Sequence, residues 1–195
     1  MTTDPTGTNG TRDAVMPGTV ADLVTRIRAI QCLVQDLREL AEWGIEALDR
    51  GHRHRAATGI NGLPHLGAHL PGHPLERIAA GLGTSDDYEW ITTRLCDAAG
   101  TVEECVNHLE RYRDTLHGEC GPGAANTLTN VIRGGGGNMT LRLALELLVE
   151  ESRNGQHPPG ALQRQAQSIV RFIDLLNTNL AELLELIVRH ARGRG

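Results

Sequence analysis

The sequence predicts an all-α protein, an antiparallel helical bundle of three long heptad-patterned helices and a broken fourth element. Apolar residues recur at alternating spacings of three and four in three long segments, which places them on one face of each helix. Segments rich in glycine and proline separate these stretches. Aromatic residues make up only 3 % of the 195 residues, and the strict alternation of β-strands is missing. The core is therefore expected to be leucine, isoleucine, valine and alanine packed helix on helix.

The first helix is predicted from Thr19, its N-cap, to an end near Arg50 and Gly51. Charged residues occupy the face opposite its apolar residues, so the helix needs partners along its whole length. Its apolar face, which we call the first seam, consists of Val20, Leu23, Ile27, Ile30, Val34, Leu37, Ala41, Gly44 and Leu48. Residues 1–18 are rich in threonine and glycine and are expected to form a flexible tail. Residues 19–195 are expected to form a single domain.

A long connection rich in histidine, glycine and proline is predicted over 51–84. Seven glycines and prolines forbid a continuous helix there: Gly59, Gly62, Pro64, Gly67, Pro71, Gly72 and Pro74. Pro74 to Ala80 could still form one or two helical turns.

The second long helix is predicted from an N-cap at Thr84, Ser85 or Asp86 to about His117. Its apolar face, the second seam, is Tyr88, Ile91, Leu95, Ala98, Val102, Cys105, Leu109, Tyr112 and Leu116. Of its eight acidic residues, only Asp87 falls on or beside this face. Gly100 is expected to mark a close backbone approach or a bend. Trp43 and Trp90 are expected to pack at the edge of the bundle.

The fourth element is predicted as one broken helix or two short ones, separated by a run of four glycines. The first piece is Ala124–Arg133, and the second is capped by Asn138 or Thr140 and runs to about Arg153. A turn at Gly118–Gly123 precedes it, and a turn at Asn154–Gly160 follows it. The closing helix is predicted over Ala161–Ala191. Its apolar face, the third seam, is Leu162, Ala166, Ile169, Ile173, Leu176, Leu180, Leu183 and Ile187.

Composition excludes several classes of function. All nineteen basic residues are arginine, so chemistry that needs lysine, such as a phosphate-loop lysine or a Schiff base, is absent. The net charge of −5 argues against a nucleic-acid partner. Neither a signal peptide nor an apolar run of membrane-spanning length is visible. The four cysteines form no C-x-x-C pair and indicate reduced thiols in a cytoplasmic protein.

The strongest candidate for chemistry is a histidine cluster within the connection. It consists of His52, His54, His65, His69 and His73. Three of these are spaced by four, as ligands on one helix face would be, and imidazole suits a divalent transition metal. Pro71 and Gly72 interrupt such a helix, however, so a solvated polar loop without any cofactor is the favoured interpretation.

Other candidate sites are weaker. No Glu-x-x-His motif occurs, and Glu103, Glu104 and Glu110 beside His108 are expected to point outward, so a ferritin-like di-metal core is not supported. Arg133 followed by four glycines invites a phosphate-loop interpretation, but a hinge fits better because no strand precedes it. His117 and Cys120 are expected to be an accidental pair in a turn.

These observations favour a non-enzymatic bundle that acts by self-association or by binding a protein partner. Four glycines break the counter-element and should prevent it from covering the first seam evenly, so at least a dimer is predicted. A first alternative is a small-ligand or metal sensor that uses residues 52–84 as a lid. A second is an enzyme in which the loop histidines act as acid–base groups.

Overall fold

The computed structural model describes residues 18–59, 72–135, 140–154 and 161–193, and it confirms the all-α helical bundle. The main helices are α1 (Val20–Thr58), α3 (Ser85–Asn107), α4 (Arg113–Gly135), α5 (Thr140–Asn154) and α6 (Ala161–Gly193). The shorter elements are α2 (Pro74–Ala79) and the 3-10 turn η1 (His108–Tyr112). None of the described residues lies in a strand. The predicted turn after Asn154 and most of the predicted N-terminal tail lie outside the described residues.

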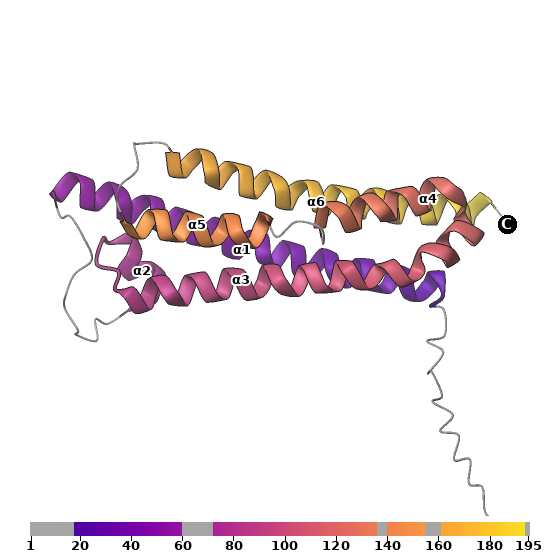
Figure 1. Cartoon of the computed structure of the whole chain (residues 1–195), viewed down its shortest axis with the longest axis horizontal. Coiled ribbons are helices and arrows are strands. Elements are labelled where there is room, and N and C mark those ends of the chain that lie inside the picture. Colours follow the sequence, from indigo (N-terminus) through magenta and orange to yellow (C-terminus); the bar gives the residue numbers. More distant parts are fainter. Residues whose placement is uncertain (1–17, 60–71, 136–139, 155–160, 194–195) are drawn as a thin grey trace, which may run out of the picture.

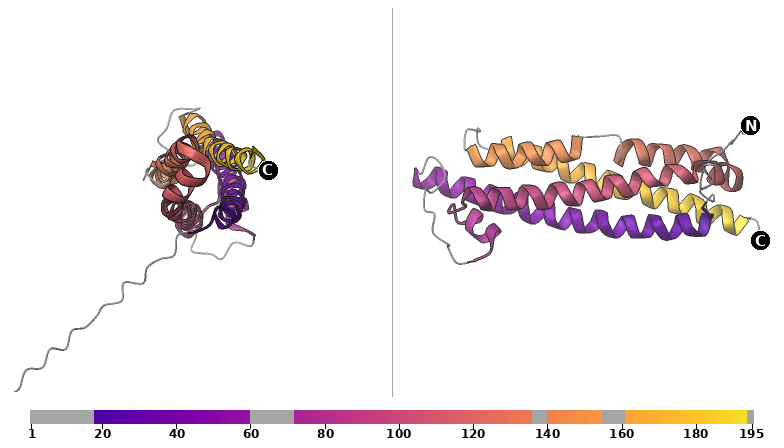
Figure 2. Two further views of the ribbon diagram at one scale, coloured as in Figure 1. Left: turned by 90° about the vertical axis from the view of Figure 1, so that its right-hand side faces the viewer. Right: turned by 60° about the horizontal axis from the view of Figure 1, so that its bottom comes forward.

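The helices form an up-down bundle with four positions (Figure 1). The longest helix, α1, runs opposite to both of its neighbours, α3 and α6. The second half of α4 and the whole of α5 follow one another along the fourth position, between α3 and α6 (Figure 2). The broken fourth element of the prediction is therefore confirmed as two consecutive helices.

Helix α1 is longer than its apolar pattern indicated. Thr19 caps its start by accepting a hydrogen bond from the Asp22 amide at 3.1 Å, as predicted. The predicted end near Arg50 and Gly51 is wrong, because the helix continues to Thr58 and ends at Gly59 with φ 68°. The apolar pattern is lost because the next inward positions hold Gly51 and Arg55, and both are buried.

Gly51 permits α2 to cross α1 closely. A Cβ atom at this position would lie 2.0 Å from the carbonyl oxygen of Ile78 in α2, so no other residue fits without displacing that helix. The close approach that was one of two expectations at Gly100 is wrong, since no described atom beyond the neighbouring backbone of its own helix lies within 4 Å of a Cβ placed there. The close backbone contact is instead made at Gly51, the residue at which the first helix was predicted to end.

The second helix continues beyond Asn107 through η1 into the first half of α4. The helical path breaks at Gly121 alone, with φ 81° and ψ 177°, and resumes at Pro122. The turn predicted over Gly118–Gly123 is therefore a break at a single residue, Gly121. Pro122 suits the new helix start that follows, because proline favours the first position of a helix.

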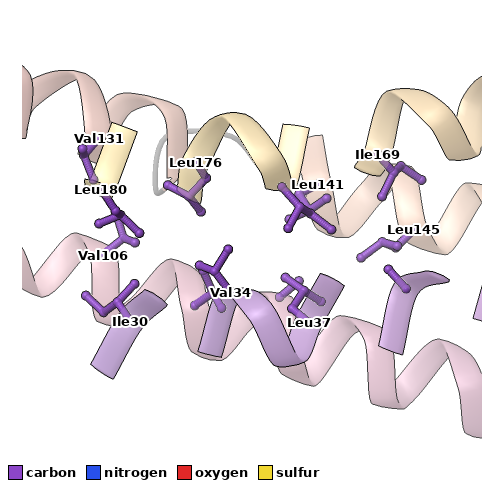
Figure 3. Close-up of a cluster of buried hydrophobic side chains, with 14 of the residues drawn as sticks. Ile30, Val34, Leu37, Val106, Val131, Leu141, Leu145, Ile169, Leu176 and Leu180 are labelled. Carbon is purple, nitrogen blue, oxygen red and sulfur yellow. The ribbon is translucent and has the colours of Figure 1, made fainter. Parts of the chain in front are cut away.

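The three seams meet in one continuous core (Figure 3). In the first seam every residue after Val20 is buried, and in the third seam every residue from Ala166 to Ile187 is buried. In α3, Ala99 and Val106 are buried in place of Ala98 and Cys105, because a straight helix drifts from a strict seven-residue repeat. One chain therefore covers its own first seam, so the premise of the dimer prediction is wrong; the oligomeric state itself stays a prediction.

A substitution in the third seam tests the core. Leu183 is fully buried, so Leu183→Asp would bury a carboxylate and is expected to cost several kcal/mol of a folding free energy of about 5–15 kcal/mol. Leu175→Asp is the matched control on the same helix, because Leu175 is exposed, and should change stability by less than about 0.5 kcal/mol. Urea unfolding of both variants measures the difference; equal stabilities would contradict the seam assignment.

Two glycine substitutions test the α1–α2 crossing. Gly51→Ala should displace α2 and cost at least about 2 kcal/mol, as overpacking of a rigid contact does. Gly100→Ala meets open space within a helix and should stabilise the protein by about 0.5–1 kcal/mol. In thermal melting, the midpoint should fall for Gly51→Ala and rise for Gly100→Ala. A stable Gly51→Ala variant would show that α2 does not require this contact.

Candidate functional site

The structure describes three of the five histidines of the predicted metal cluster. His52 and His54 lie on α1, and His73 is the N-cap of α2, whereas His65 and His69 lie outside the described residues. Among the described residues, no group of three or more histidine, cysteine or acidic side chains could hold a metal ion. Metal binding by the five histidines together stays a prediction. Since His52 and His54 belong to a helix, the segment that could act as a lid begins only after Gly59.

His73 has a structural role in the described part of the chain. Its Nδ1 accepts a hydrogen bond from the Leu75 amide at 3.3 Å, and its ring packs edge-on against Trp90 with centroids 5.0 Å apart. Trp90 is half-buried, as expected for a residue at the bundle edge. Trp43 was expected to pack in the same way, but 61 % of it is exposed, because it lies on the side of α1 turned away from the core.

A buried ion pair joins α2 to α3. Arg77 contacts Asp87 through two hydrogen bonds, one of them 3.0 Å from Nε to Oδ2. Asp87 also accepts hydrogen bonds from the Thr84 amide and hydroxyl, at 2.9 and 3.0 Å. Burial alone would raise the pKa of Asp87, but the hydrogen bonds from Arg77 and Thr84 outweigh it and hold the pKa below its ordinary value. The one acidic residue predicted beside the second seam is therefore a fixed carboxylate that holds α2.

A buried arginine closes the same end of the bundle. Only 5 % of Arg55 is exposed, and no carboxylate in the described part of the chain pairs with it. Its guanidinium donates to the Tyr88 hydroxyl and, at 2.8 Å, to the carbonyl oxygen of Ser152. That carbonyl belongs to the last turn of α5, where carbonyl groups lack helical partners, so Arg55 caps α5 and its charge faces the negative end of that helix.

The opposite end of the bundle has a matching contact. Tyr112 is fully buried and donates its hydroxyl hydrogen to Asp22 in the first turn of α1. This hydrogen bond is the main reason why the pKa of Asp22 lies below its ordinary value. Both tyrosines of the chain thus connect an end of the second seam to a charged residue of α1.

The environment of Cys96 disfavours the reactive thiolate form of its side chain. Burial, together with a contact to Glu146, raises the pKa of Cys96 to about 11, which keeps that thiol protonated at neutral pH. His117 is exposed and Cys120 is buried, and the expectation that their pairing in the sequence is accidental stays a prediction.

The main surface feature is a hollow between α1, α5 and α6, which we call the α1–α6 groove. It comprises two adjoining hollows of about 230 and 400 Å³ that share Ile45, Gln163 and Val170. Leu48 and Leu148 complete the apolar lining of the first hollow. The hollow exists because α6 presents short or polar residues to α1 at this level, namely Gln163, Ala166 and Gln167.

The α1 side of the groove is acidic. Glu42, Glu46 and Asp49 line it, and each pairs with an arginine one turn away on the same helix. Among the described residues, Arg171 is the charged residue that lines the α6 side. The pairs of Glu46 and Asp49 are largely exposed, and such pairs stabilise a helix by only about 0.3–0.5 kcal/mol. The carboxylates can therefore exchange their partners for those of a ligand at little cost.

Comparisons with known proteins supply no relative of this chain. Neither the models of known families, nor curated proteins, nor solved structures give a match. Within the described residues, no helix combines the length and hydropathy needed to cross a membrane.

The sequence did not predict the α1–α6 groove, Arg55 or the Arg77–Asp87 pair as sites. The groove has no local signature, since its walls come from three helices whose neighbours are fixed only by the fold. Arg55 could have been found, because it continues the spacing of the first seam from Leu48 through Gly51. Asp87 stood out as the one acid beside the second seam. Its partner Arg77 lies in the one or two helical turns predicted over Pro74 to Ala80, whose position against the second helix the spacing did not reveal.

The ion pair between α2 and α3 gives a pH-dependent prediction. Asp87→Asn should lower the free energy of unfolding at pH 7 by about 2–3 kcal/mol, below the 3–5 kcal/mol of a fully buried pair because Arg77 is partly exposed. Asp86→Asn, at an exposed neighbouring acid, is the matched control and should cost less than about 1 kcal/mol.

The sign of the pH effect follows from the lowered pKa of Asp87. The pair stabilises the fold fully above the unfolded pKa of about 3.9, and this stabilisation is lost as the pH falls below that value through the folded pKa. The difference between Asp87→Asn and the parent should therefore shrink in acid. Urea unfolding at pH 7 and near pH 3 measures it, and a difference that grows in acid would refute the assignment.

Proposed function

We propose that this protein is a non-enzymatic helical bundle that binds a protein partner in the α1–α6 groove. The bound segment is an amphipathic helix that carries arginine or lysine beside its apolar residues. The observation that carries the proposal is the apolar lining of the groove, with Ile45 and Val170 half-buried although the first seam beside them is covered.

Three features of the groove support a helical occupant. It lies between two long helices, which is the geometry in which amphipathic helices dock. Its apolar residues come from α1, α5 and α6, so an occupant would contact all three. The residues that line it belong to helices, and a preformed site loses little conformational entropy on binding.

The acidic side of the groove supports a basic occupant. Glu42, Glu46 and Asp49 lie along one wall, where cationic side chains of a bound helix could take over their weak intrahelical contacts. Arg38, one turn from Glu42, bridges α1 to Asp174 of α6 at 2.7 Å, and neither residue lines the groove. A second copy of this chain is less favoured, because the first seam that would have driven self-association is already buried.

Probe peptides test this proposal. A fluorescent helical peptide with leucines three and four residues apart and flanking arginines should bind the protein more tightly than a counterpart with glutamates, as measured by fluorescence anisotropy. Val170→Arg places a bulky cation in the groove and should weaken binding by at least about tenfold. Leu175→Arg, on an exposed position of α6 that does not line the groove, is the matched control and should leave binding unchanged.

Two further measurements define the outcome. The double variant Glu46→Gln, Asp49→Asn should reduce the preference for the arginine peptide. Equal binding of both peptides, or equal effects of Val170→Arg and Leu175→Arg, would contradict the proposal. A dimeric mass of the parent by light scattering that becomes monomeric in Val170→Arg would instead assign the groove to a second copy of the chain.

A further inference from the structure

Helix α4 bends at the other end of the bundle (Figure 1). A second hollow is lined by residues on both sides of this bend. The chain turns at Gly121, and side chains from both halves of α4 face one cavity of about 310 Å³, which we call the α4 pocket. Its polar lining is Arg113, Asp114, His117, Asn126, Thr129 and Arg133. Residues four apart lie on the same face of a helix. Residues 113 and 117 therefore share a face in the first half of α4, and residues 125, 129 and 133 share a face in the second half.

Nitrogen-bearing side chains dominate the α4 pocket. Arg133 is exposed and forms no ion pair among the described residues, so its guanidinium has donors to offer. Arg113 pairs with Glu110 at 2.8 Å, which leaves part of its donor fork free. His117 and Asn126 add ring and amide nitrogens from the two halves of α4. In the part of the lining that the structure describes, Asp114 supplies the single carboxylate.

This donor set fits an oxyanion better than a cation. Two guanidinium groups present planar donor pairs that match the oxygens of a phosphate group. A metal ion would need several oxygen ligands, and one carboxylate beside two arginines does not supply them.

We propose that the α4 pocket binds a small phosphate-bearing molecule, either inorganic phosphate or a phosphate monoester. Arg113 and Arg133 contact the phosphate oxygens from opposite halves of α4, and His117 and Asn126 supply further donors. The volume lies at the lower end of the range for ligand pockets, which suits a small molecule. The proposal is independent of the α1–α6 groove, which lies at the other end of the molecule.

Titration with phosphate at constant ionic strength, followed by the amide signals in NMR spectra, tests the proposal. Saturable shifts are expected in α4 around Asn126. Arg133→Gln should weaken phosphate binding about tenfold, as the loss of one charged hydrogen-bond partner does. Asp114→Asn should strengthen it several-fold, since it removes the opposing charge. Arg28→Gln, at an exposed arginine of α1, is the matched control and should change nothing.

The signs of these effects decide the outcome. Absence of saturable shifts, weaker binding in Asp114→Asn, or equal effects of Arg28→Gln and Arg133→Gln would overturn the proposal. Acetate binding as tight as phosphate would overturn the phosphate assignment. Tighter binding of glycerol phosphate than of inorganic phosphate would identify a monoester as the ligand class, and the reverse order would identify the free ion. Unchanged melting temperatures without phosphate confirm that the variants fold.

Discussion

The apolar face of α1 has to be covered along its whole length, and the arrangement of the other helices follows from that requirement. Helices α3 and α6 cover its two sides, and the fourth position is filled by two shorter helices, α4 and α5. The break between them is tolerated because Val131 of α4 and Leu141 of α5 both reach the core, where Val34 and Leu176 lie at the intermediate level (Figure 3). A discontinuous helix thus gives a continuous core.

Polar contacts at the two ends of the bundle set the position of α3 relative to α1. A buried hydrogen bond is directional and is lost when its partners shift. Tyr88 reaches Arg55 at one end, and Tyr112 reaches Asp22 at the other. Both tyrosines belong to the second seam, which continues from α3 into η1. The face that packs against the core therefore also carries the hydrogen bonds that fix its position along α1.

The sequence was sufficient for the fold because heptad spacing reports directly on which face of a helix is buried. It failed at the end of α1, where Gly51 and Arg55 occupy inward positions that no hydrophobic pattern would assign to a core. Gly51 is there because α2 crosses at that point, and Arg55 because the end of α5 needs a donor. Both reasons lie in segments far along the chain, so local spacing could not reveal them. The groove was hidden for the same reason.

The charged residues divide into those that maintain the fold and those that remain available. Arg55, Arg77 and Asp87 are buried or paired within the bundle, and a ligand could engage them only by disrupting it. The carboxylates of the α1–α6 groove and the arginines of the α4 pocket are held by weak pairs or by none. The α4 pocket also spans the break at Gly121, the one described point within α4 where the backbone leaves the helical path. A ligand that bridges Arg113 and Arg133 would therefore fix the angle between the halves of α4, so occupancy of the pocket and the geometry of this end of the bundle would be coupled.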